Sequence, residues 1–472
     1  MTGKAPLVVV GDALLDRDLT GHADRLAPDA PVPVVADCAE RVRPGGAALA
    51  AYLAARDGRD VTLITALDDG PAGRELRRLL DPFLTVVPLP MSGEVPQKTR
   101  VLAQGRPVVR LDHGAGHARE ATDEARAALA AASAVLVSDY GRGAADTLRA
   151  ELHGRPPEVW DPHPRGGPPV AGTRLVTPAR AEAHGFAAAL PADRNRGGGD
   201  APRSDLRAVA HEACALVRHW RVAAVTVTLG ARGALLSYGE HPLLVPVSAA
   251  HHGDPCGAGD RFAATAAGQL ADGVLVGEAV EGAVTAATAF VGAGGAAGLL
   301  GPPRAAGTAP SADDPDDPDD PDDPAGLVAK VRATGGTVVA AGGCFDLLHA
   351  GHVGLLQAAR RIGDCLVVCV NSDASVRRRK GEGRPVNPLA DRVRVLRALA
   401  CVDAVAVFDE DTPERLLAEL RPDVWVKGGD YAGAELPEAA LLDEWGGQAV
   451  LLPYLDGRSS TALMARAAEG AR

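Results

Sequence analysis

The first 300 residues alternate short apolar runs with alanine-rich stretches. The apolar runs predict buried β-strands, and the longer stretches between them have the spacing of amphipathic helices. This alternation is typical of an α/β fold built around a largely parallel sheet. The predicted strands are Leu7–Val10, Val61–Thr65, Ala134–Ser138, Leu175–Thr177 and Val222–Thr228, and the predicted helices include Ala47–Arg56, Ala125–Ala132 and Asp205–Trp220.

The last 140 residues repeat the alternation on a smaller scale. The pattern predicts a compact, doubly wound (Rossmann-like) α/β domain, in which ligands bind at the carboxyl ends of the strands. The predicted strands are Thr337–Ala341, Cys365–Asn371, Ala404–Phe408 and Val424–Lys427, and helices are predicted to begin near His352, Pro388 and Thr412.

An acidic repeat separates the two patterns. Residues 311–324 contain four Asp-Asp-Pro units. Proline interrupts regular pairing and adjacent aspartates repel one another, so the segment is predicted to be an extended, solvated linker. We therefore divide the chain into a first domain (1–305), a linker (306–332) and a second domain (333–472).

Charge and composition narrow the classes of partner. Lys and Arg total 49 and Asp and Glu total 61, a net charge of −12, but eight of the acidic residues lie in the repeat, and without them the net charge is −4. No basic stripe indicates nucleic acid binding. No apolar run is long enough to span a membrane. The seven scattered cysteines include no Cys-x-x-Cys pair, which fits a reducing cytoplasm.

The second domain begins with the most informative motif. The run Gly342-Gly-Cys-Phe-Asp-Leu-Leu-His-Ala-Gly-His352 follows an apolar strand and leads into an amphipathic segment. His349 and His352, three residues apart at a helix start, share a face where N–H groups and the helix dipole attract phosphate. The pair could also be a metal site. The glycines Gly342 and Gly343 allow close approach of a phosphate.

Three further segments carry phosphate-binding chemistry. Lys427 and Gly428 follow a strand, and Lys380 lies in a basic loop that could cover a triphosphate. Ser459, Ser460 and Thr461 precede a short helical tail, where hydroxyl and N–H groups could bind another phosphate.

The histidine motif resembles that of the cytidylyltransferase-like branch of the H-x-G-H nucleotidyltransferases, and the resemblance covers nearly all of 335–472. The stretches 370–373, 384–388 and 426–431 are similar to the adenylyltransferase half of the bifunctional heptose-phosphate enzymes. The resemblance implies that the histidines bind ATP and stabilise the transition state. It also assigns Phe345 to the nucleotide and Asp346 and Asp373 to the sugar phosphate.

The first domain has its own phosphoryl-transfer motif. Gly257-Ala258-Gly259-Asp260 opens an alanine-rich helix, where N–H groups could bind a transferring phosphoryl group and Asp260 could accept a proton from a hydroxyl. Gly-Ala-Gly turns before helices are common, so the motif alone does not decide the function.

Taken with Thr228–Gly233 and Pro44–Gly46, this motif resembles those of ribokinase-like sugar kinases, and most of all the kinase half of the same bifunctional enzymes. Five further stretches carry that likeness: 11–16, 25–34, 98–100, 110–112 and 138–143. The resemblance implies Asp260 as base, Gly257 to Gly259 as anion hole, and Gly230 and Gly233 at ATP. It places Asp16, Gly45 and Gly46 at the sugar, and Lys98 and Arg100, which could otherwise be a solvated basic strand, at its phosphate.

The chain departs from the kinase pattern at three positions. Leu49 stands where the family has Asn, and Ala179 replaces the Asn of a motif that, with Glu182, organises hydrated Mg²⁺. These changes raise the alternative that the kinase half is impaired. Cys256, where the family often has Thr, is interpreted as a small packed residue.

The two resemblances together predict a cytoplasmic enzyme that uses ATP and Mg²⁺. Its first domain would phosphorylate heptose 7-phosphate at O1, and its second would transfer an adenylyl group to heptose 1-phosphate. A homodimer through the kinase half is implied by resemblance only. The alternatives are a chain in which only the transferase is active, a CTP-dependent polyol-phosphate cytidylyltransferase, and a non-enzymatic scaffold.

Overall fold

The computed structural model describes residues 3–28, 30–104, 106–191, 205–240, 242–247, 253–299, 323–428 and 437–452. The chain forms two compact units, which are treated separately below. The first contains Met1–Leu190, Ala215–Thr228 and Ala249–Ala309, and the second contains Pro191–Cys214, Leu229–Ser248 and Pro310–Arg472.

A parallel sheet forms the centre of the first unit. Its strands run in the order β5-β4-β1-β10-β11-β12-β13, and every neighbouring pair is parallel. All residues of β1 and β10 are buried, as expected for strands that are covered on both faces. The strands are β1 (Leu7–Gly11), β4 (Val61–Ala66), β5 (Thr85–Leu89), β10 (Val135–Ser138), β11 (Val159–Asp161), β12 (Leu175–Val176) and β13 (Val225–Thr228).

Helices flank this sheet, and α8 packs against both α1 and α9. The predicted bounds of α1 and α7 agree with the structure. The helices of this unit are α1 (Ala47–Arg56), α2 (Pro71–Leu80), α3 (Asp123–Ala131), α4 (Ala144–Thr147), α5 (Arg149–Gly154), α6 (Arg180–Ala188), α8 (Ala258–Ala271), α9 (Val276–Gly292) and α10 (Gly295–Gly298), while α7 (Asp205–Trp220) contributes to both units.

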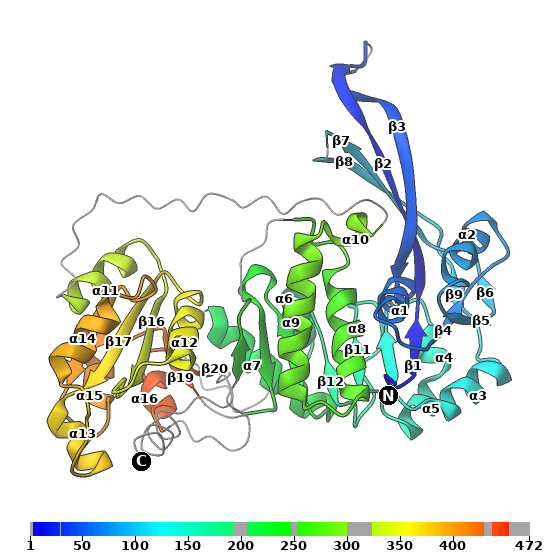
Figure 1. The fold of residues 1–472 in the computed structure, drawn as a ribbon. Coiled ribbons are helices and arrows are strands. Elements are labelled where there is room, and N and C mark those ends of the chain that lie inside the picture. Colours follow the sequence, from blue (N-terminus) through cyan, green and yellow to red (C-terminus); the bar gives the residue numbers. More distant parts are fainter. Residues whose placement is uncertain are drawn as a thin grey trace. The chain divides into compact units, whose positions relative to one another are not determined.

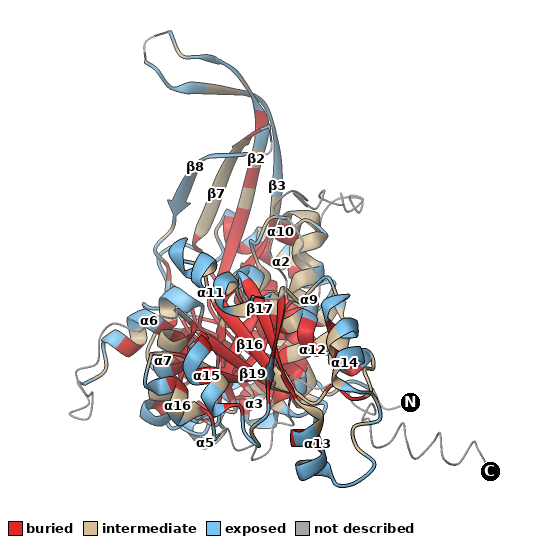
Figure 2. Ribbon diagram, turned by 90° about the vertical axis from the view of Figure 1, so that its left-hand side faces the viewer, coloured by how far each residue is buried: buried red, intermediate tan, exposed pale blue. Residues whose placement is uncertain are grey.

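A second sheet projects from the first unit and was not predicted. Its order is β3-β2-β7-β8, and Figure 1 shows β2 and β3 as a long ribbon that extends away from the central sheet. The ribbon is buried where it joins the unit and exposed farther out, and β8 is exposed throughout (Figure 2). The strands are β2 (Ala13–Leu26), β3 (Pro33–Gly46), β7 (Gln97–Ala103) and β8 (Arg106–His113), and β6 (Met91–Ser92) pairs separately with β9 (His117–Ala118).

The second unit contains a doubly wound parallel sheet in the order β18-β17-β16-β19-β20. Its central strands are buried, while the surrounding helices have exposed faces (Figure 2). The strands are β16 (Val338–Gly343), β17 (Cys365–Asn371), β18 (Ala404–Phe408), β19 (Val424–Gly428) and β20 (Gln448–Leu452), and the helices are α11 (Pro324–Ala333), α12 (Ala350–Arg360), α13 (Asp373–Lys380), α14 (Leu389–Arg397), α15 (Glu414–Leu420) and α16 (Ala439–Asp443).

The second unit also holds a 3₁₀ turn, η1 (Gly230–Arg232), and the antiparallel pair β14 (Ala234–Ser237) and β15 (Leu243–Val245). Within the described ranges, no helix has both the length and the apolar character that crossing a bilayer requires. All seven cysteines have free thiols.

Candidate active sites

Asp260 lies in the first turn of α8, next to the predicted anion hole. Gly257 caps this helix with φ of +81°, a conformation that disfavours any side chain, and a Cβ there would lie 2.8 Å from Leu49 Cδ2. A Cβ on Gly259 would meet nothing within 4 Å, so the helix start faces open space. The Ala258 N–H already donates to Pro255 O at 3.0 Å. Gly257 and Gly259 are therefore the better candidates for binding a phosphoryl group.

The Asp260 carboxyl is buried and accepts a hydrogen bond from a tyrosine side chain as well as one from its own backbone. The Tyr140 hydroxyl donates to Asp260 Oδ1 at 2.9 Å. Burial raises the pKa of Asp260 to about 7, and the bond from Tyr140 opposes this rise. A carboxyl group that ionises close to neutral pH is well suited to act as a general base.

Other acidic groups share this end of the sheet. Burial raises the pKa of Asp161 well above its ordinary value, and the Thr177 hydroxyl donates to that carboxyl at 2.8 Å. Glu182 caps its own helix by accepting the Ala179 N–H at 2.8 Å, and burial raises its pKa too. In the described part of the chain, no cluster of three or more His, Cys, Asp or Glu side chains is arranged to hold a metal ion directly. Contact with Mg²⁺ through water, as predicted for Glu182, is compatible with this geometry.

The predicted sugar residues come together where β2 and β3 join the unit. A Cβ on Gly45 would lie 2.8 Å from the Asp16 carboxyl carbon, and Gly46 has φ of +58°. The two glycines therefore allow the backbone to pass directly beside the Asp16 carboxyl. Burial raises the pKa of Asp16, while the Arg43 guanidinium, 3.7 Å away, opposes the rise.

Lys98 and Arg100, predicted to hold one phosphate together, point to different partners. Arg100 lies 3.4 Å from Asp18 Oδ1 and 2.6 Å from Cys256 Sγ, so its guanidinium is already engaged. The Lys98 ammonium lies over the Tyr140 ring, 5.4 Å from its centre. Lys98 also lines a cavity of about 350 Å³.

This cavity, which we call the cationic pocket, contains more positive than negative groups. Lys98 and three arginines face a single aspartate. Burial and then the neighbouring cations lower the pKa of His163 to about 4. The arginines were missed from the sequence, although Arg110 and Arg142 lie in stretches that carried the family resemblance. The lining residues are Pro96, Gln97, Lys98, Arg110, Asp112, His113, Gly114, Arg142, His163 and Arg165.

Gly230 is the first residue of the 3₁₀ turn η1, and Gly233 follows its last residue. Both have positive φ, and a Cβ on Gly233 would lie 2.0 Å from Val245 O, so only glycine fits there. Both belong to the second compact unit, whereas Asp260 belongs to the first. Their role at the ATP of the kinase stays a prediction.

The two histidines of the second motif share one face, as predicted. His349 caps α12, its Nδ1 accepting the Gly351 N–H at 3.1 Å, and its ring stacks on His352 with centroids 3.9 Å apart. Burial, followed by His349 and Lys380, lowers the pKa of His352 to about 4. A neutral imidazole is thus available near pH 7 to donate an N–H to a phosphate oxygen.

The glycines of this motif make room for aromatic rings. A Cβ on Gly342 would lie 2.2 Å from the Trp425 ring, and one on Gly343 would lie 3.0 Å from the Phe345 ring. Phe345 has φ of +47° and packs edge-to-face on His352 at 5.5 Å. Phe345 is therefore placed to support the imidazole.

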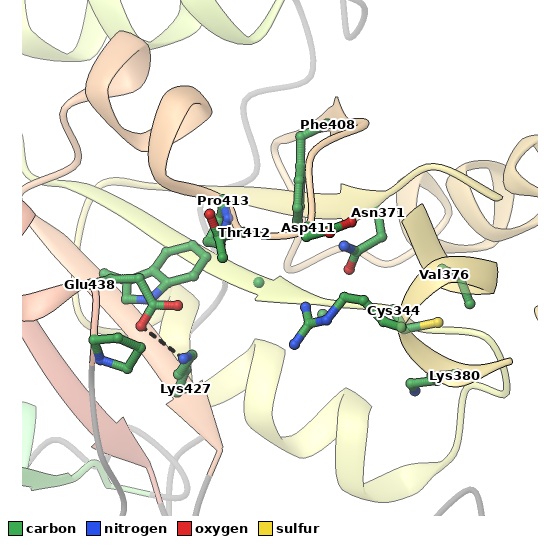
Figure 3. A pocket seen from close by; sticks show the side chains of 15 residues that line it. Cys344, Asn371, Val376, Lys380, Phe408, Asp411, Thr412, Pro413, Lys427 and Glu438 are labelled. Carbon is green, nitrogen blue, oxygen red and sulfur yellow. Dashed lines mark hydrogen bonds and ion pairs between the residues drawn. The ribbon is translucent and has the colours of Figure 1, made fainter. Parts of the chain in front are cut away.

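A cavity of about 450 Å³, the nucleotide cavity, opens at the carboxyl ends of β16, β17 and β19. In Figure 3, Lys427 and Glu438 lie on one side of it and Asn371, Val376 and Lys380 on the other. Lys427 Nζ pairs with Glu438 Oε2 at 2.8 Å. The lining residues are Gly342, Gly343, Cys344, Asn371, Val376, Arg379, Lys380, Phe408, Asp411, Thr412, Pro413, Trp425, Lys427, Pro437 and Glu438.

Asp346 and Asp373 hold the loops around this site. Asp346 accepts the N–H groups of Val386 and Asn387 at 2.7 and 2.9 Å. Asp373 pairs at 2.7 Å with Arg392, which also donates to Cys344 O at 2.7 Å. The buried Arg392 therefore connects the histidine motif, at Cys344, with Asp373 on α13. No sequence pattern predicted this role for Arg392. Direct binding of sugar phosphate by the two aspartates stays a prediction.

The last two predicted segments are only partly covered by the structure. Gly428 is the final, exposed residue of β19, beside the lining residue Lys427. Ser459, Ser460 and Thr461 lie outside the described residues.

Both halves of the chain match known protein families. The profile of the pfkB family of carbohydrate kinases matches residues 171–300, and the cytidylyltransferase-like profile matches residues 340–445. The bifunctional protein HldE of Streptomyces coelicolor is 77% identical over 471 residues, which cover 100% of this chain and 98% of that protein. The bifunctional protein HldE of Alkalilimnicola ehrlichii is 36% identical, with 98% of this chain and 97% of that protein covered.

Two solved structures each match 61% of the chain. Ribokinase from Arabidopsis thaliana, complexed with ribose and ATP, is 19% identical with a TM-score of 0.45, and covers 61% of this chain and 93% of its own. Phosphofructokinase-2 from Escherichia coli, in complex with fructose-6-phosphate, is 17% identical with a TM-score of 0.47, and covers 61% of this chain and 94% of its own.

Proposed function

The chain belongs to the family of HldE bifunctional proteins, and we propose that it makes a nucleotide-activated heptose in two separate steps. The predicted fold class and the pairing of a sugar kinase with a nucleotidyltransferase are confirmed by the two family profiles and the full-length relatives. In the proposal, the first domain phosphorylates heptose 7-phosphate at O1 with ATP. Another enzyme removes the 7-phosphate, and the second domain joins heptose 1-phosphate to the adenylyl group of ATP, releasing pyrophosphate.

The observation that carries the proposal is the presence, in one chain, of a buried carboxyl at an anion hole and a stacked histidine pair at a helix start. Each supplies what one of the two reactions needs. A kinase needs a base for the attacking hydroxyl, and a nucleotidyltransferase needs donors for the charge that develops on the α-phosphate.

In the first step, Asp260 accepts the proton of the sugar hydroxyl at O1. The oxygen attacks the γ-phosphorus of ATP, and the bond from that phosphorus to the bridging oxygen breaks to release ADP. The N–H groups of Gly257 and Gly259 bind the transferring phosphoryl oxygens. Mg²⁺, when bound, neutralises phosphate charge. Glu182 and Asp161, two carboxyls whose pKa burial raises, would face its water shell.

The cationic pocket is proposed to hold the distal phosphate of the sugar. Arg110 pairs with Asp112 at 2.6 Å, whereas Arg142 and Arg165 repel each other, and a dianionic phosphate would relieve that repulsion. This revises the expectation for Arg100, which is engaged with Asp18 and Cys256, and keeps Lys98. Arg142 and Arg165 take the place of Arg100 in the proposal.

In the second step, an oxygen of heptose 1-phosphate attacks the α-phosphorus of ATP. The bond from that phosphorus to the β-phosphate oxygen breaks, and pyrophosphate leaves. His349 and His352 donate hydrogen bonds to the phosphate oxygens as charge builds up. Lys380 and Lys427, which line the nucleotide cavity, are proposed to bind the leaving phosphates.

Two finer points belong to the proposal. The cytosol, which supplies ATP, is the proposed location, and free thiols at all seven cysteines fit it. A homodimer through the projecting sheet is also proposed, because its strand β8 is exposed and includes the apolar residues Val108, Val109 and Leu111. Sedimentation analysis of the intact chain and of a Leu111→Lys variant would test the dimer.

A pair of assays tests the main proposal on the intact chain. With Mg-ATP and heptose 7-phosphate, phosphorus NMR should show a bisphosphate, and Asp260→Asn should lose this signal alone. With heptose 1-phosphate, pyrophosphate release should be faster with ATP than with CTP, and His352→Ala should lose this signal alone. Absence of the bisphosphate from a folded protein would refute the kinase half, and a preference for CTP with glycerol 3-phosphate would refute the adenylyl half.

A further inference from the structure

Tyr140 connects the two ends of the kinase site. It follows β10, in the segment that continues into α4. Its hydroxyl donates to Asp260 Oδ1 at 2.9 Å. Its ring stacks on His163, with centroids 5.8 Å apart, and carries the Lys98 ammonium at 5.4 Å. Lys98 and His163 both line the cationic pocket. Tyr140 therefore contacts both Asp260, the proposed base, and two residues of the cationic pocket, which is proposed to hold the distal phosphate of the sugar.

The backbone around Tyr140 is held in place by buried acceptors. Asp12, which is 3% exposed, accepts the N–H groups of Tyr140, Arg142 and Ala144 at 3.0, 2.9 and 3.1 Å. Asp139 accepts the N–H of Gly141 at 2.8 Å. Four of the five backbone N–H groups between Tyr140 and Ala144 are thus hydrogen-bonded to buried carboxylates. This fixes the backbone from which the Tyr140 hydroxyl reaches the Asp260 carboxylate.

A buried carboxylate with a fixed side-chain donor has a defined orientation. The bond to Oδ1 restricts rotation about the Cβ–Cγ bond, so the direction in which the carboxylate presents its oxygens to a sugar hydroxyl is fixed. Reactions that depend on such alignment lose much of their rate when the attacking group and its base are free to turn.

We propose that Tyr140 is a positioning residue of the kinase, which fixes the Asp260 carboxylate for proton abstraction and links its orientation to the cationic pocket. This rests on the proposed function of Asp260 as the base. Tyr140 itself does not touch the reacting atoms in this proposal.

The hydrogen bond also affects ionisation, which gives the proposal a distinctive readout. A donor to the ionised carboxylate favours that form and lowers its pKa. The other groups that act on Asp260 are Asp16 from β2, Lys98 from β7 and Asp161 from β11. Of these, the two aspartates disfavour the ionised form and Lys98 favours it. Removing the Tyr140 hydroxyl should therefore move the pKa of Asp260 upward.

The test compares the intact wild-type chain with Tyr140→Phe. At pH 7 the variant should phosphorylate heptose 7-phosphate at least tenfold more slowly, with KM for ATP unchanged. The acidic limb of its kcat–pH profile should move to higher pH, so that part of the loss is recovered near pH 9. Tyr52→Phe, a change at a tyrosine on α1 whose hydroxyl is bonded to Arg56, is the matched control. Adenylyl transfer by the same samples reports on their integrity.

Two further measurements keep the outcome decisive. Carbon NMR of the Asp260 carboxyl, assigned by its loss in Asp260→Asn, should show the upward pKa shift in Tyr140→Phe without any substrate. Because this NMR measurement needs no turnover, it tests the role of Tyr140 independently of the kinase assignment. The kinase assignment itself fails only if the wild-type chain does not phosphorylate heptose 7-phosphate. Replacement of Tyr140 by difluorotyrosine, a better donor of the same shape, should move the acidic limb to lower pH. An unchanged profile in both variants, or a loss that is equal at every pH, would overturn the proposal.

Discussion

Replacing Asp260 by Asn should remove kinase activity and at the same time stabilise the first unit above neutral pH. The kinase loss follows from the lost base, about 10²- to 10⁴-fold for a group of this kind. The stability gain follows from burial, which raises the pKa of Asp260 from an ordinary value of 3.8 to about 7. The folded state therefore disfavours the ionised form that the unfolded chain adopts above pH 4.

The sign and size of the effect can be worked out by linkage. Because the folded pKa is raised, the stability associated with this carboxyl is complete below pH 3.8 and is lost as the pH rises to about 7. At about 1.4 kcal/mol for each tenfold change in proton affinity, the penalty approaches roughly 4 kcal/mol at pH 8 and is roughly 2 kcal/mol at pH 5. Asn, which carries no charge and still accepts from Tyr140, should recover much of the difference.

The assay must report on the first unit alone, because a chain with two units does not unfold in one step. Urea titrations read by hydrogen-exchange mass spectrometry of peptides from β1, β4 and β10 meet this need. Asp69→Asn, at an exposed carboxylate, is the control. Asp260→Asn should show a gain at pH 8 that exceeds its gain at pH 5. Equal gains at the two pH values, or a loss at pH 8, would refute the argument from burial.

Three other perturbations test separate parts of the proposal. His352→Ala should slow adenylyl transfer by about 10²- to 10³-fold and leave the kinase activity unchanged. In the wild-type protein without ligands, histidine NMR should show that His352 stays neutral down to about pH 4. A His352 signal that titrates near pH 6.5 would contradict this. Arg165→Ala should raise KM for heptose 7-phosphate at least tenfold without changing KM for ATP, whereas equal effects on both would argue against a phosphate in the cationic pocket. Leu49→Asn should not raise kcat of the kinase. It should lower the free energy of unfolding in urea by about 1–3 kcal/mol, because residue 49 is buried against Gly257. A large rise in kcat would instead mean that Leu49 impairs the kinase.

The elements that the sequence predicted well are those with buried, regular patterns. Helix α1 and strands β17 and β18 agree at both ends, because their apolar residues are enclosed by neighbours on the faces that the pattern indicates. The projecting sheet was missed for the opposite reason. Strand β8 is exposed at all its residues, and the outer parts of β2 and β3 are exposed on both faces, so no alternation of apolar and polar positions marks them.

The same distinction applies to the sites. Asp260 and the histidine pair lie in contiguous motifs, in which a strand, a turn and a helix start follow one another, so their chemistry could be predicted from the sequence. The cationic pocket draws Lys98 from β7, Arg110 from β8, and Arg142 and Arg165 from segments after β10 and β11. Only the strand register and the loop conformations bring them together.

Arg100 shows the limit of strand periodicity. It lies two residues after Lys98 and thus on the same face of β7, and the family resemblance assigned both cations to the sugar phosphate. Its ion pairs with Asp18 and Asp254 engage its guanidinium, and no sequence pattern distinguishes the two cations. The Tyr140–Asp260 bond was not predictable for the same reason, since it joins residues 120 positions apart.

Burial favours the uncharged form of both proposed catalytic groups, in opposite ways. It raises the pKa of Asp260 to about 7 and lowers that of His352 to about 4, so both sites lose charge as they are desolvated. The cationic pocket is different, because three arginines and a lysine line it beside a single aspartate. An uncharged sugar would leave that repulsion in place, whereas a sugar that carries a phosphate would remove it. In the proposal, selection for a phosphorylated sugar therefore resides in the cationic pocket, separate from the carboxyl proposed as the base, and Tyr140 contacts both that carboxyl and two residues that line the pocket.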